Sequence, residues 1–277
     1  MDRYNLPVVP GRRTITVLDT ITVLSEEDAG AVVVSASHGG ISSGRFALRV
    51  PLAGVFFNDA GVGKDQAGIK SFDELDAAGV PAATFDCMSA RIGSGKDSIE
   101  NGIVSRCGKL AIELGLAPGQ TVSEAAHHLA FEADIAAVTA PAENLLSRSK
   151  LDLANGCVHL LDSVSMMTAE HLDQSVVTGS HGGLISANFV FPHRPAFVSF
   201  SDAGIGKENA GIAALGVLES EGIASFCVSH QSARIGEPRD MIDSGIISAA
   251  NGPAVRKGIR VGMLVSLAID LFPAPGL

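Results

Sequence analysis

The stretch AVVVSASHGG at residues 31–40 decides the fold class, because an apolar run leads directly into a polar, glycine-rich turn. A continuous apolar run of this kind is typical of a parallel strand that is covered on both faces. Val55–Phe57 and Pro81–Phe85 show the same pattern. We therefore predict an α/β fold with mainly parallel sheets and motifs at the carboxyl ends of the strands.

The segments around these strands predict a further strand and two helices. Residues 14–18 and 21–23 are largely β-branched and predict a strand, and Ser25 followed by acidic residues resembles a helix start. Helices are expected over residues 67–78 and 103–114, each followed by a glycine. Strands alternating with helices again indicate a parallel sheet.

The chain is a tandem duplication. An offset of 143 positions aligns Leu18–Leu129 with Leu161–Phe272 without a gap, and about 39 of 112 aligned positions are identical. We predict a first α/β half over residues 1–129, a connecting segment over 130–160 with a helix near 141–148, and a second half over 161–277. The expected fold is two tandem, pseudo-symmetric repeats.

Identity between the halves concentrates in three islands, each expected where a strand passes into a helix. Open α/β sheets bind ligands at the carboxyl ends of their strands, so this placement favours a functional site. The islands are SHGG at 37–40 and 180–183, DAGVGK at 59–64 with DAGIGK at 202–207, and SARIG at 89–93 and 232–236.

The polar island residues form the predicted catalytic set. Serines are candidate nucleophiles or oxyanion donors, histidines are candidate proton carriers, and lysines are candidate bases or anion anchors. The aspartates complete the set. The set consists of Ser37, His38, Asp59 and Lys64 with their copies Ser180, His181, Asp202 and Lys207.

The remaining island residues form the predicted substrate-binding set. Arginines suit carboxylate clamps, and glycine amides can hold an oxyanion. The structural alternative is that the glycines only shape tight turns, and that Asp–Lys or Asp–Arg bridges tie loops together. The set consists of Gly39, Gly40, Gly63, Ser89 and Arg91 in the first half, and Gly182, Gly183, Gly206, Ser232 and Arg234 in the second.

This inventory predicts an enzyme acting on a small carboxylate-bearing substrate in a cleft between the halves. Our leading hypothesis is hydrolysis of an amide or cyclic amide C–N bond, with Ser37 or Ser180 as nucleophile. The alternatives are a lyase or isomerase that removes a proton next to a carboxylate, and a non-catalytic binder of small anions. The halves differ beside the third island, where Cys87 aligns with His230 and Asp86 with Ser229.

Composition excludes several partners and cofactors. The net charge of -10 and the absence of Trp argue against nucleic acid, and no apolar window is long enough for a membrane span. Walker A, dinucleotide and C-x-x-C motifs are absent, so no cofactor is predicted. A divalent metal held by His38, Asp59, His181 and Asp202 stays open as an alternative. The N-terminus lacks a signal-peptide pattern and mean hydropathy is +0.30, so we expect a cytoplasmic homo-oligomer.

Overall fold

The computed structural model describes residues 2–7, 10–132, 146–153 and 156–272. The chain divides into two compact units. The first unit comprises Met1–Gly61, Gly68–Leu145 and Gly206–Glu208, and the second comprises Val62–Ala67, Leu146–Ile205 and Asn209–Leu277. Each unit therefore includes a short loop segment that comes from the other half of the sequence.

The first unit contains a six-stranded sheet with strands in sequence order, β1 to β6. The four central strands are parallel, and β1 and β6 pair with them antiparallel at the edges. The strands are β1 Arg3–Asn5, β2 Ile15–Leu18, β3 Val32–His38, β4 Gly54–Asn58, β5 Ala82–Phe85 and β6 Val104–Cys107.

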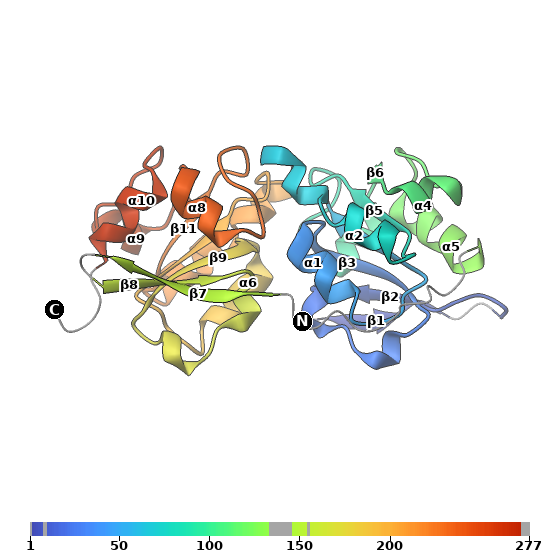
Figure 1. Ribbon diagram of the computed structural model, residues 1–277, viewed down its shortest axis with the longest axis horizontal. Coiled ribbons are helices and arrows are strands. Elements are labelled where there is room, and N and C mark those ends of the chain that lie inside the picture. Colours follow the sequence, from blue (N-terminus) through green and yellow to red (C-terminus); the bar gives the residue numbers. More distant parts are fainter. Residues whose placement is uncertain (1, 8–9, 133–145, 154–155, 273–277) are drawn as a thin grey trace. The chain divides into compact units, whose positions relative to one another are not determined.

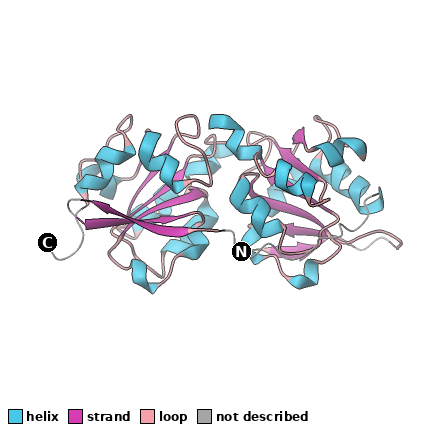
Figure 2. Ribbon diagram, in the orientation of Figure 1, coloured by secondary structure: helices cyan, strands magenta, loops and turns pink. Residues whose placement is uncertain are grey.

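Helices connect the strands of the first half (Figures 1 and 2). Several are single 3-10 turns, labelled η. The helices are η1 Ile21–Val23, η2 Glu26–Asp28, α1 Ile41–Ala47, η3 Lys64–Ile69, α2 Phe72–Ala77, α3 Gly95–Asn101, α4 Lys109–Glu113 and α5 Val122–Glu132.

The second unit repeats this topology in a six-stranded sheet, β7 to β12. Its central strands are again parallel, with β7 and β12 antiparallel at the edges. The strands are β7 Arg148–Leu153, β8 Gly156–Leu161, β9 Ser175–His181, β10 Phe197–Ser201, β11 Ala224–Val228 and β12 Ile247–Ala250. The helices are η4 Val164–Met166, η5 Ala169–His171, α6 Leu184–Val190, η6 Lys207–Ile212, α7 Ala214–Ser220, α8 Pro238–Ser244, α9 Gly252–Arg256, α10 Val265–Ala268 and η7 Ile269–Leu271.

Both faces of the second sheet are buried, which explains its apolar strands. Along β10, Phe197 packs with α8 and α10 residues, while Val198 and Phe200 pack with α6 and α7 on the opposite face. In the first unit, Val32 and Phe56 pack against Leu129 of α5. The predicted fold, two similar α/β halves with mostly parallel sheets, is confirmed.

Some predicted elements differ from the observed ones. Residues 21–23, expected to be extended, form the 3-10 turn η1 because Thr20 caps its start. The helix expected over residues 103–114 is β6 followed by α4, because the edge of the sheet pairs with residues 104–107. Within the expected connection at 130–160, residues 148–153 and 156–160 belong to β7 and β8. The helix expected near 141–148 falls mostly outside the described residues, and Arg148 begins a strand. Among the described helices, none has the length and apolar character to cross a membrane.

Candidate functional site

All three islands of each half follow neighbouring parallel strands. SHGG ends β3 and β9, the DAG loops follow β4 and β10, and SARIG follows β5 and β11. Because these strands are parallel neighbours, the islands of one half meet at one edge of their sheet.

The island serines hold backbone groups in place. Ser37 Oγ accepts a hydrogen bond from Ile21 N at 3.0 Å, and Ser180 Oγ accepts one from Val164 N at 2.9 Å, so both tether the strand end to a 3-10 turn. In the same way, Ser89 Oγ accepts a hydrogen bond from Ile103 N, and Ser232 Oγ accepts one from Ile246 N. The nucleophilic role of Ser37 or Ser180 stays a prediction.

The SHGG histidines are buried and bonded to their own turns. His38 Nδ1 accepts from Gly40 N, and His181 Nδ1 accepts from Gly183 N, both at 3.1 Å. An accepting Nδ1 belongs to an imidazole whose proton sits on Nε2. Burial lowers the pKa of His181 to about 4, so this ring is neutral near pH 7.

The DAG loops share an unusual backbone in both halves. Ala60–Gly63 have φ of 50, 71, 62 and 68°, and Ala203–Gly206 have 48, 75, 62 and 70°. Positive φ is unfavourable for the β-branched Val62 and Ile205. Such conformations persist only where the surroundings enforce them, and they gather at functional sites.

Asp240, which lies outside the islands, accepts hydrogen bonds from two island residues of the second unit, Lys64 and Arg234. Lys64 Nζ donates to the two carboxylate oxygens of Asp240 at 2.9 and 3.1 Å and to Ser244 Oγ at 2.8 Å. Arg234 donates to the same carboxylate through its backbone N at 2.8 Å and through Nη2 at 3.1 Å. Islands of both halves thus meet at Asp240.

The first unit contains the matching cluster. Lys207 Nζ donates to both oxygens of Asp97 at 3.0 and 3.2 Å, and Arg91 donates to it through its backbone N at 2.7 Å and Nε at 3.2 Å. Arg91 also pairs with Glu208 at 3.0 Å. Burial opposes ionisation of Asp97 and Asp240, but the hydrogen bonds they accept hold the pKa of both below the usual value.

Asp97 and Asp240 were not among the predicted site residues, although they are identical in the two halves at the 143-residue offset. Identity that continues beyond the third island of each half was the signal that could have found them. These contacts support the structural alternative, in which Asp–Lys and Asp–Arg bridges tie loops together. Binding of a substrate by the lysines and arginines stays a prediction.

The units differ at the buried aspartate of the DAG loop. Asp202 Oδ1 accepts from His230 N at 2.9 Å and from His230 Nδ1 at 2.8 Å. A carboxylate only accepts hydrogen bonds, so Nδ1 carries the ring proton and Nε2 is the accepting nitrogen. Nε2 accepts a hydrogen bond from Gln231 Nε2 at 2.9 Å. Burial opposes ionisation of Asp202, yet the bonds from His230 keep its pKa below the usual value.

The first unit carries a cysteine at this place. Asp59 Oδ1 accepts from Gly61 N and Cys87 N, both at 3.0 Å. Burial, aided by the charges of Asp59 and Asp86, raises the pKa of the Cys87 thiol to about 12. Since a thiolate is the reactive form, Cys87 is a poor nucleophile at neutral pH.

Three side chains of the first unit are arranged closely enough to share a cation. Asp59, Asp86 and Cys87 each offer a ligand atom, and these atoms lie within 4.8 Å of one another. The set that the sequence leaves open as an alternative metal site, drawn from both halves, is a different one. Metal binding stays untested, as does the cleft shared by the two halves.

Comparison with known proteins adds no assignment. No protein-family model, no curated protein and no solved structure matches the chain. The function is therefore inferred from the side chains themselves.

Proposed function

We propose that the protein is a hydrolase for an amide or cyclic amide C–N bond in a small carboxylate-bearing substrate, with His230 as general base. The observation that carries the proposal is the 2.8 Å hydrogen bond from His230 Nδ1 to Asp202. This pairing fixes the ring orientation and directs the basic Nε2 away from the aspartate, as in established Asp–His pairs.

Burial and exposure support these two roles. The Asp202 side chain is 3% exposed and the His230 side chain 19%, so the orienting group is shielded while the base reaches solvent. Gly63 lies against His230, and Lys64 N donates to the His230 carbonyl oxygen at 2.8 Å. The loop with positive φ therefore fixes the backbone of the base.

In the proposed reaction, water displaces the exposed Gln231 side chain from His230 Nε2. His230 Nε2 then takes a proton from this water as its oxygen attacks the amide carbon. The C–N bond then breaks, and the nitrogen leaves with the proton that His230 returns. The products are a carboxylic acid and an amine. Water is the nucleophile in this proposal. Attack by Ser37 or Ser180, which we expected from the sequence, is the alternative route to the same products.

The test is a panel of small amides, cyclic amides and carboxylic acids incubated with the protein in D2O and followed by proton NMR. Hydrolysis yields new carboxylate and amine signals. Loss of a C–H signal next to the carboxylate would instead indicate the lyase or isomerase alternative. Absence of any turnover across the panel would favour the non-catalytic binder.

The matched variants use the difference between the two units. For an active substrate, His230→Gln should lower turnover by about 10²–10⁴, the usual contribution of a general base. Cys87→Ser alters the equivalent position of the first unit and should leave turnover unchanged. Equal losses in both variants would contradict the assignment. Self-association and a cytoplasmic location stay predictions, and light scattering of the purified protein would test the former.

A further inference from the structure

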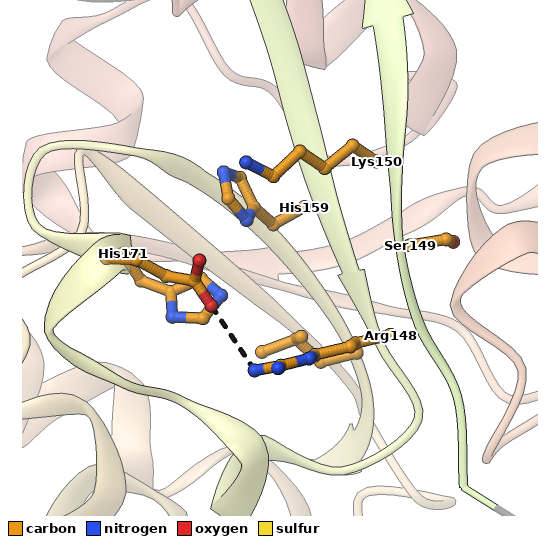
Figure 3. Close-up of a pocket in the computed structure, with 7 residues that line it drawn as sticks. Arg148, Ser149, Lys150, His159 and His171 are labelled. Atoms are coloured by element: carbon orange, nitrogen blue, oxygen red, sulfur yellow. Dashed lines mark hydrogen bonds and ion pairs between the residues drawn. The ribbon is translucent and has the colours of Figure 1, made fainter.

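The second unit has a pocket beside its edge strand, away from the islands in sequence. It has a volume of about 210 Å³ and lies where β7 and β8 meet η5 (Figure 3). The side chains that matter here are Arg148 and Lys150 of β7, His159 of β8, and Glu170 and His171 of η5.

One lining group is a buried hydrogen-bond donor without an acceptor. The His171 side chain is fully buried, and its Nδ1 accepts from Thr168 N at 2.9 Å as part of a capping box. Nδ1 also lies 3.1 Å from Thr168 O, but the shorter contact with Thr168 N assigns the ring proton to Nε2. Among the described residues, Nε2 has no hydrogen-bond partner. Buried donors are nearly always paired, so an unpaired one in a pocket wall favours an absent acceptor.

Positive charge surrounds this donor. Arg148 and Lys150 project from the same face of β7, while Ser149 points to the other side (Figure 3). Arg148 pairs with Glu170 at 3.3 Å, whereas Lys150 has no carboxylate within ion-pair distance in the described part of the chain. The His159 ring packs edge-on against His171 with centroids 4.7 Å apart. The walls thus offer several donors and one acid.

The first unit has different side chains at the equivalent place. Strand register makes Arg3 the equivalent of Arg148, since the two face Leu18 and Leu161. Likewise Asn5 and Thr16 correspond to Lys150 and His159, and Asp28 aligns with His171.

The donors of the first unit are satisfied internally. Arg3 Nη2 donates to the buried carboxylate of Asp28 at 2.7 Å, and Thr16 Oγ1 donates to Asn5 Oδ1 at 3.0 Å. In the second unit the acid has become His171, and the neutral pair has become Lys150 and His159. Each change replaces an acceptor or neutral group by a donor or cation.

We propose that this pocket binds a small anion through a carboxylate or phosphoryl group, with His171 Nε2–H and Lys150 as donors. This site is independent of His230 and of the proposed hydrolysis.

The experiment titrates the full chain with inorganic phosphate in one arm and malonate in the other, at low ionic strength. NMR follows the imidazole C–H signals. We expect saturable shifts of His159 and His171 with at least one anion, and no such shifts of His127 and His128 in the first unit. The arm with tighter binding distinguishes phosphoryl from carboxylate recognition.

Two variants test the donors. His171→Asp restores the first-unit arrangement, in which Asp28 also closes its capping box, so the fold should persist while affinity falls by about tenfold or more. Lys150→Gln should weaken binding about tenfold, whereas Lys257→Gln, an equal charge loss at an exposed position, should not. Absence of saturable shifts in both arms, or equal affinity of Lys150→Gln and wild type, would overturn the proposal.

Discussion

The two units share their scaffold and differ in chemistry. In both units a Lys and an Arg donate hydrogen bonds to one buried aspartate, and both units have a DAG loop with positive φ. At Asp202 the second unit has a histidine, where the first has Cys87 beside Asp59. The comparison teaches that a scaffold shared by two copies can hold different side chains at one position, and this position is where we seek the chemistry of the second unit.

The largest expected effect is a loss of unfolding free energy when the aspartate of either cluster is replaced. Unequal losses in the two units would contradict a shared scaffold. Asp97→Asn and Asp240→Asn each leave a Lys and an Arg facing a neutral amide. Only the aspartates are buried, and their Lys and Arg partners are partly exposed, so the expected cost is about 1–3 kcal/mol, below that of a fully buried pair. Urea denaturation should show similar losses of unfolding free energy for both variants. A loss below about 1 kcal/mol in either would mean that its cluster is not structural and would favour a substrate-binding role.

Acid should destabilise the second unit through His181. Its pKa is about 4 in the folded chain against an ordinary value near 6.5, so protons bind preferentially to the unfolded state. The stabilisation is complete above about pH 6.5 and is lost as the pH falls toward 4, at about 1.4 kcal/mol per pH unit.

His181→Asn keeps an acceptor for Gly183 N but cannot titrate in this range. Unfolding free energies measured between pH 7 and pH 4, roughly the span of the shift, should fall less steeply for the variant. Parallel curves for variant and wild type would contradict a buried, neutral His181.

A smaller effect distinguishes the structural role of the DAG loops from their role in positioning His230. Gly63 and Gly206 have φ of 68° and 70°, and an added Cβ would lie 2.8 Å from His230 O and 3.0 Å from Cys87 O, respectively. Gly63→Ala and Gly206→Ala should each cost about 2 kcal/mol of unfolding free energy. Only Gly63→Ala should also reduce turnover, since it displaces the base. Equal turnover in the two variants would contradict a role of the Gly63 loop in positioning His230 for catalysis.

The sequence predicted the fold because its signals are local or repeated. Apolar runs such as residues 31–34 mark buried strands, and the 143-residue offset reveals two equivalent sheets. The helix α3 was missed because Gly95–Asn101 is short and contains weak helix formers. The strand β6 was missed because tertiary pairing, which no local pattern encodes, overrides helix propensity at residues 104–107.

The site was predicted in part. The islands do lie at strand ends, but the contacts of Lys64 and Lys207 with aspartates far along the chain depend on loops that join the other unit. His230 was visible as a difference between copies, whereas its bond to Asp202 required the fold. His159 and His171 carry no spacing motif. The sequence offset pairs His171 with Asp28, but only strand register reveals Arg3 and Asn5 as the counterparts of Arg148 and Lys150.

The most direct test of the difference between the units is the tautomer of His230, read from imidazole nitrogen chemical shifts in the 15N-labelled protein. Asp202 should hold the neutral ring with its proton on Nδ1, leaving Nε2 unprotonated as the base. That result would support the catalytic role of the second unit. A neutral His230 with its proton on Nε2 would contradict it, because the ring would then have neither the aspartate bond nor a basic nitrogen facing the substrate.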